Sequence, residues 1–245
     1  MRLLSALAAS LALCAVLTLT PGSGAKDTSA ICPPEPKESA AREADWDRAL
    51  KNLAVLGRTL PAEPDSRLLM PVDGVRVRDI EDTWGAPREG AREHSGQDVF
   101  AAPGTFVRSA TAGVVWRIGN SNNGGNWVYV LGAGGRRYYY AHLGRVNREL
   151  REGQTVNVRT ILGTVGNSGN AVATPAHLHL SVFTAYDPGT SCRFLAINPL
   201  PYCGTAEDQP CGLNVDRYWS PRDSWCWRAG VGWLDPDTAG TPRSA

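Results

Sequence analysis

Histidine is scarce in this chain: it occurs only four times among 245 residues, as His94, His142, His177 and His179. An excess of charge of one sign is also lacking, because 25 basic and 24 acidic residues leave a formal net charge of +1. A chain without a basic excess lacks the electrostatic signature of proteins that bind nucleic acids. We therefore expect no nucleic-acid partner.

Several common chemical motifs are missing as well. The chain contains no HExxH sequence, in which a glutamate assists a zinc-bound water, and no pair of cysteines at the CxxC spacing of structural zinc sites. Its glycine-rich stretches GNSNNGG (119–125), GAGG (132–135) and GNSGN (166–170) separate expected strands. None of them lies between a strand and a helix, so none is expected to bind phosphate.

The first 25 residues have the pattern of a secretory signal peptide. Arg2 is followed by an apolar run from Leu3 to about Thr20 and by the small residues of PGSGA. Cleavage there would start the mature chain near Lys26, in the periplasm or outside the cell and without stable membrane insertion. An uncleaved anchor is the alternative, since the apolar run approaches a spanning length, but the helix-breaking PGSG favours cleavage.

The remaining chain divides into three parts by composition. Residues 26–66 form an expected helical arm, in which apolar residues at helical spacing precede Gly57, a residue that suits a helix end. These apolar residues are Trp46, Ala49, Leu50, Leu53 and Ala54. Residues 67–200 form the main domain, and residues 201–245 form an extension rich in cysteine and tryptophan.

The main domain is expected to be mainly β. Short β-rich runs occupy 113–118, 126–131, 136–143, 155–158, 161–166 and 177–183, with turn-rich segments between them. Closely spaced strands without a helical pattern between them favour an antiparallel sheet folded into a sandwich or a barrel.

Cysteine is concentrated near the C-terminus. With Cys14 removed in the leader, five cysteines remain: Cys32, Cys192, Cys203, Cys211 and Cys226. In an exported protein these are expected to form disulfide bonds, and an odd number leaves at least one cysteine without a partner in its own chain. The sequence does not select the connectivity.

Two of the four histidines stand one residue apart, in HLHLSVF (177–183). Residues at i and i+2 of a strand point to the same face, so His177 and His179 project together. Upstream, His94 and Asp98 occur in REHSGQDVF, where Gly96 allows a turn that brings the imidazole and the carboxylate together. Three nitrogen or oxygen ligands and a water form a catalytic zinc site. His94, Asp98 and one histidine of HLH would supply such a site.

His142 lies at the end of an expected strand, two residues after Tyr140, so the two side chains are expected to share a face. Any one histidine, considered alone, could simply bond to the backbone. Together, however, all four occur in three short segments at strand edges, which favours a single metal-centred site.

These segments are similar to the lysostaphin/LytM-type zinc metalloendopeptidases, which cut peptides of bacterial cell walls. HxxxD, a later lone histidine and a distant HxH appear here in that family's order, and the resemblance covers about residues 67–200. It implies a duplicated hybrid motif fold, peptidoglycan peptides as the substrate and one zinc ion held by His94, Asp98 and His179. It also implies that His142 and His177 are the catalytic histidines.

Two other functions fit parts of this pattern. Non-enzymatic activators of wall amidases share the implied fold, but they typically lack ligand residues that this chain retains. Phosphocarriers of the sugar phosphotransferase type also pair two histidines on a related fold, but a cytoplasmic phosphocarrier would have no secretory leader.

Overall fold

The structure is a computed structural model that describes residues 30–34, 40–204, 226–228 and 232–234. The expected signal peptide, at 1–25, and most of the C-terminal extension lie outside these residues. Among the described helices, none combines the length and the apolar character needed to cross a membrane.

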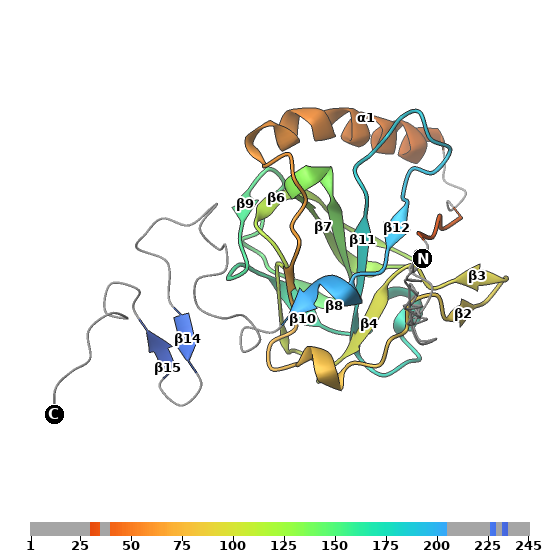
Figure 1. Cartoon of the computed structure of the whole chain (residues 1–245). Helices are drawn as coiled ribbons and strands as arrows, with labels where there is room; N and C mark the ends of the chain where they lie inside the picture. Colours follow the sequence, from red (N-terminus) through yellow and green to blue (C-terminus); the bar gives the residue numbers. More distant parts are fainter. Residues whose placement is uncertain (1–29, 35–39, 205–225, 229–231, 235–245) are drawn as a thin grey trace, which may run out of the picture.

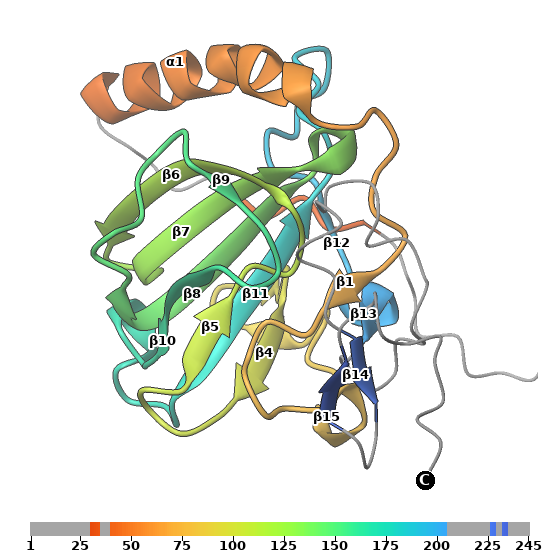
Figure 2. The ribbon, with the colours of Figure 1, turned by 90° about the vertical axis from the view of Figure 1, so that its left-hand side faces the viewer.

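The main domain is built on a large antiparallel sheet (Figures 1 and 2), as the strand pattern predicts. Its strands run in the order β12, β11, β8, β7, β6, β9. They span Ala196–Ile197, His177–Phe183, Arg137–Val146, Gly125–Gly132, Gly113–Ser121 and Thr155–Val156, respectively. Three further strands, β4 (Gln97–Phe100), β5 (Phe106–Arg108) and β10 (Ile161–Val165), complete it, with β4 paired to β11 and β10 paired to both β5 and β8.

Shorter elements surround this sheet. Two short strands, β1 (Leu68–Leu69) and β13 (Cys203–Gly204), pair in parallel, a departure from the otherwise antiparallel pattern. Two hairpins are formed by β2 (Pro87–Arg88) with β3 (Arg92–Glu93) and by β14 (Cys226–Arg228) with β15 (Gly232–Leu234). Single 3-10 turns occupy Gly57–Thr59, Val77–Asp79, Ala133–Gly135, Gly169–Ala171 and Leu200–Tyr202.

The two faces of the sheet have different roles. Strand alternation directs Tyr138, Tyr140, Leu178 and Leu180 into an apolar core, where all four are fully buried. Tyr140 is a structural residue there, since its hydroxyl oxygen accepts a hydrogen bond from the Ala110 amide at 2.8 Å. The opposite face is shared between an aromatic cluster and the histidines.

The arm packs on this second face through α1 (Ala40–Leu56), which lies across the sheet in Figures 1 and 2. Trp46 contacts four aromatic rings at centroid distances of 5.6–6.3 Å, those of Trp116, Trp127, Tyr129 and Phe194. Ala49, Leu50 and Leu53 are buried, as their spacing predicts.

One detail of the predicted helix is wrong. Ala54 is exposed, because the buried stripe continues through Leu56 instead. The end of the helix is as predicted, because α1 ends at Leu56, directly before Gly57. Gly57 then begins a 3-10 turn, in which the Leu60 amide donates to the Gly57 carbonyl at 3.0 Å.

A disulfide fixes the chain that precedes α1. Cys32 bonds to Cys192, 160 residues away, in the loop before β12. Next to it, Ile31 and Ala196 exchange two backbone hydrogen bonds of 2.9 and 2.8 Å. Cys203 is a free thiol in the structure, and burial raises its pKa to about 12.

Candidate metal and catalytic site

The register between β4 and β11 assembles the centre of the site. It places Asp98 directly opposite His179, and it places Leu178 opposite Val99. Because paired residues of antiparallel strands share a face, Leu178 and Val99 enter the core while Asp98 and His179 project together on the other side. His94 joins them from the loop between β3 and β4.

Three donor atoms of these residues form a nearly equilateral triangle. His94 Nε2 lies 2.9 Å from His179 Nδ1, and each nitrogen lies 3.1 Å from Asp98 Oδ1. Tetrahedral zinc with bonds of ~2.0–2.1 Å would separate neighbouring ligand atoms by about 3.3 Å. Two imidazole nitrogens and one carboxylate oxygen at this spacing therefore fit a zinc ion.

Hydrogen bonds on the outer sides of both imidazoles orient them toward this point. His94 Nδ1 donates to the Thr83 carbonyl at 2.7 Å, which leaves Nε2 unprotonated in the neutral ring. His179 Nε2 lies 2.8 Å from Ser181 Oγ, and donation to that hydroxyl leaves Nδ1 as the free lone pair. In each ring, the nitrogen that faces the triangle is thus the one able to bind a metal.

His177 and His142 stand beside the triangle. The Nδ1 atom of His177 donates to the Pro175 carbonyl at 2.8 Å, and that of His142 donates to the Ser168 carbonyl at 2.9 Å. The ring of His142 lies 5.0 Å from that of His177 and 5.8 Å from that of His179, between centroids. Both Nε2 atoms therefore remain available for chemistry next to the triangle.

The expectation that His142 shares a face with Tyr140 is wrong. Between its pairs with Val128 and Asn126, β8 carries two residues, Ala141 and His142, where β7 carries only Trp127. His142 is the extra residue of this bulge and has a left-handed φ of 58°. The bulge reverses the alternation, so that Tyr140 enters the core while His142 turns toward the other histidines.

The surroundings shift the proton affinities of the site. Burial alone would raise the pKa of the Asp98 carboxyl, but interactions with the polar imidazoles of His179 and His94 outweigh it and hold that pKa well below its usual range. Burial lowers the pKa of His142 to about 4 and also lowers the pKa of His179. Near pH 7 the site therefore combines the Asp98 carboxylate with the neutral imidazoles of His142 and His179.

Gly96 is needed for space and not for a left-handed turn. A Cβ atom at this position would lie 2.6 Å from Cε1 of His179 and 2.8 Å from the Leu180 carbonyl oxygen. The backbone before β4 thus passes directly against the His179 ring, which only glycine permits.

Sequence reasoning missed the residues that support the site. Thr83 contributes both its carbonyl to His94 and its hydroxyl to the Asp98 amide, at 2.9 Å. No local pattern marks Thr83. The buried side chain of Gln97 holds its segment in place, because Oε1 accepts a hydrogen bond from the Thr83 amide and Nε2 donates one to the Glu81 carbonyl. Ser181 could have been found, because it continues the i, i+2 alternation of HLH onto the same face.

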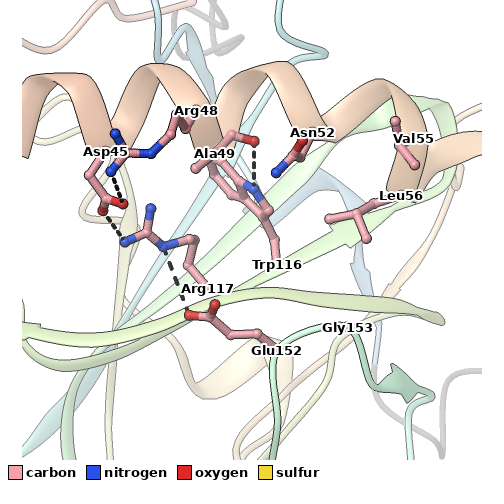
Figure 3. A pocket seen from close by; sticks show the side chains of 10 residues that line it. All are labelled: Asp45, Arg48, Ala49, Asn52, Val55, Leu56, Trp116, Arg117, Glu152 and Gly153. Atoms are coloured by element: carbon pink, nitrogen blue, oxygen red, sulfur yellow. Dashed lines mark hydrogen bonds and ion pairs between the residues drawn. The ribbon is translucent and has the colours of Figure 1, made fainter.

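A cavity of about 560 Å³ lies apart from the five predicted site residues. It is bounded by α1, β6 and the loop before β9 (Figure 3). Asp45 and Arg117 form an ion pair of 2.6 Å beside it, and Trp116 Nε1 donates to the Ala49 carbonyl at 3.2 Å. These contacts attach α1 to the sheet, and none of the four histidines lines the cavity.

Comparison with protein families matches residues 92–189 to peptidase family M23. The chain contains an M23 domain. The matched range includes all four histidines and Asp98, so the site described above lies within the M23 domain.

Three relatives illustrate the similarity. The L-Ala–D-Glu endopeptidase of Bacillus subtilis is 34% identical over 108 residues, which are 41% of this chain and 33% of that protein. The chain thus matches about a third of that relative's length. The catalytic domain of lysostaphin from Staphylococcus simulans is 26% identical with a TM-score of 0.44, covering 51% of this chain and 93% of that one. Helicobacter pylori Csd3 is 28% identical with a TM-score of 0.44, and the match covers 57% of this chain and 35% of that one.

Proposed function

We propose that this protein is an exported zinc-dependent endopeptidase that hydrolyses peptide bonds of bacterial peptidoglycan. The observation that supports this most strongly is the donor triangle of His94, Asp98 and His179 with His142 and His177 beside it. Membership of the matched domain in a peptidase family supports hydrolysis, and the Bacillus relative supports a wall peptide as the substrate.

Zinc bound at the triangle would acidify a water molecule and polarise the scissile carbonyl. The chain's own residues would handle the protons. Because Nδ1 donates to a backbone carbonyl in both His142 and His177, the neutral form of each ring presents Nε2 as a proton acceptor. Once protonated, either ring could donate a hydrogen bond to the oxyanion of the tetrahedral intermediate. The two histidines are equivalent in this respect, so we assign the pair jointly to proton transfer and oxyanion stabilisation.

Digestion of purified peptidoglycan is the direct test of this proposal. The mature chain, residues 26–245, should release peptide fragments, should carry about one zinc ion, and should lose activity with a chelator and regain it with added zinc. Mass analysis of the fragments identifies the bond: a cross-link between stem peptides or, as the name of the Bacillus relative suggests, an L-Ala–D-Glu bond within one stem. A zinc-loaded chain that releases no fragment would point instead to a non-enzymatic regulator of wall amidases.

Activity is expected to fall in acid. The pKa of His142 is lowered to about 4 and that of His179 is lowered as well, so both rings stay neutral at pH 7. In the unfolded chain, imidazoles bind protons near pH ~6.5. The unfolded state therefore binds more protons than the folded state between these values, and stability should decrease as the pH falls from ~6.5 to 4. Metal affinity should decrease once the ligand imidazoles of the folded chain become protonated. Hydrolysis rates and thermal unfolding from pH 8 to 4 test this, and a flat profile would contradict it.

A further inference from the structure

The two oxygens of the Asp98 carboxylate have different partners. Oδ1 faces the ligand nitrogens of His94 and His179, at 3.1 Å from each. Oδ2 accepts a hydrogen bond from Nη2 of Arg88 at 2.6 Å. Arg88 comes from the β2–β3 hairpin, ten residues before Asp98, and neither the zinc-site pattern nor the proposed hydrolysis accounts for it.

The hairpin presents Arg88 at the edge of the site. Its turn contains Gly90 and Ala91 in left-handed conformations, with φ of 71° and 55°, which returns the chain sharply toward His94. The Arg88 side chain is 38% exposed, whereas Asp98 is only 9% exposed. Among the described residues, Asp98 is the hydrogen-bonding partner of the Arg88 guanidinium.

A bond to Oδ2 limits how Asp98 can act as a ligand. A carboxylate can bind a metal through one oxygen or through both, and a charge-assisted hydrogen bond occupies the second oxygen. The guanidinium also balances the charge of a nearly buried carboxylate, which would otherwise carry an unfavourable desolvation cost. Partners of this kind orient ligands and typically change metal affinity or activity by ~10–100-fold when removed.

We propose that Arg88 is a positioning residue for Asp98. Its hydrogen bond holds Oδ2, so that Oδ1 alone is directed at the metal that His94 and His179 would also bind. This inference rests on the zinc site of the proposed function. It assigns the hairpin before the HxxxD segment to assembly of the site and not to contact with the substrate.

Zinc affinity, measured by competition with a chromophoric chelator, tests the proposal without any peptide substrate. Arg88→Ala should weaken zinc binding ~10–100-fold. Arg88→Lys should recover part of the loss, because an ammonium group still donates to one oxygen. Arg92→Ala is the matched control, since Arg92 pairs with Arg88 in the same hairpin, while its Nε donates to the Glu89 carbonyl. It should bind zinc as the unchanged chain does.

The outcomes separate this inference from the proposed function. An unchanged chain that binds no zinc would overturn the proposed function itself. If the unchanged chain binds zinc and Arg88→Ala binds it equally well, Arg88 does not position Asp98. Equal zinc affinity with a raised KM and an unchanged kcat would show instead that the guanidinium binds the substrate. If Arg88→Ala does not fold in the metal-free state, as judged by thermal unfolding, then Arg88→Gln, which keeps most of the side-chain packing, decides between the same results.

Discussion

Replacement of His179 by alanine is expected to remove bound zinc and to abolish peptidoglycan hydrolysis. His179 Nδ1 forms one corner of a triangle with sides of 2.9–3.1 Å, and the variant would leave only His94 and Asp98 as ligands. Two protein ligands do not complete the three-ligand set of a catalytic zinc site. Metal analysis of the purified variant should give a content near zero, compared with about one ion in the unchanged chain.

Folding of the His179 variant must be checked separately, because His179 also contacts Ser181 and packs against Gly96. Thermal unfolding of the variant and of the unchanged chain, both in chelator, compares the two without metal. A folded His179→Ala chain that retains zinc and hydrolyses peptidoglycan at the normal rate would refute the ligand assignment.

Replacement of His177 or His142 by alanine should have the opposite effect on the metal. Neither residue belongs to the donor triangle, so both variants should keep most of their zinc. Each should nevertheless lose at least ~100-fold in turnover, the scale expected when a proton carrier or oxyanion donor is removed. Zinc content and hydrolysis rates measured on the same preparations separate the two effects.

Comparison within HLH makes this test specific. His177 and His179 lie on the same strand and the same face, with only Leu178 between them. Their alanine variants therefore remove the same imidazole group from neighbouring positions of that face. If His177→Ala were metal-free while His179→Ala kept its zinc, the two roles would have to be exchanged. If all three histidine variants kept both zinc and activity, the proposed site would be wrong.

The strands of the main domain could be predicted from local pattern, because β-rich runs between glycine-rich turns carry their own signal. Each of the six expected runs contains a strand, and the sheet is antiparallel as expected. The position of α1 was predictable only in part. Its apolar spacing indicated a buried face, but the aromatic cluster around Trp46 combines residues from α1, β6, β7 and the loop after β11. Local periodicity contains no information about such contacts.

The bulge at His142 shows where strand alternation stops being a guide. Alternation predicts that Tyr140 and His142 share a face. One extra residue in β8 instead turns the His142 side chain to the opposite face from Tyr140. Such a bulge depends on how β7 and β8 register against each other, and therefore on packing along the whole hairpin.

The sequence by itself determined which groups could form a metal site: the four histidines and Asp98, placed in three short segments. It also determined that His177 and His179 share a face, because the period of a strand is a local property. The tertiary structure decided the rest. Asp98 and His179 are 81 residues apart, and only the register of β4 against β11 makes them neighbours. Likewise, the carbonyls of Thr83 and Ser168 fix the ring nitrogens of His94 and His142, and Arg88 occupies the second oxygen of Asp98. These partners are backbone groups or distant side chains, so their roles arise from the packing of separate segments and not from any local pattern.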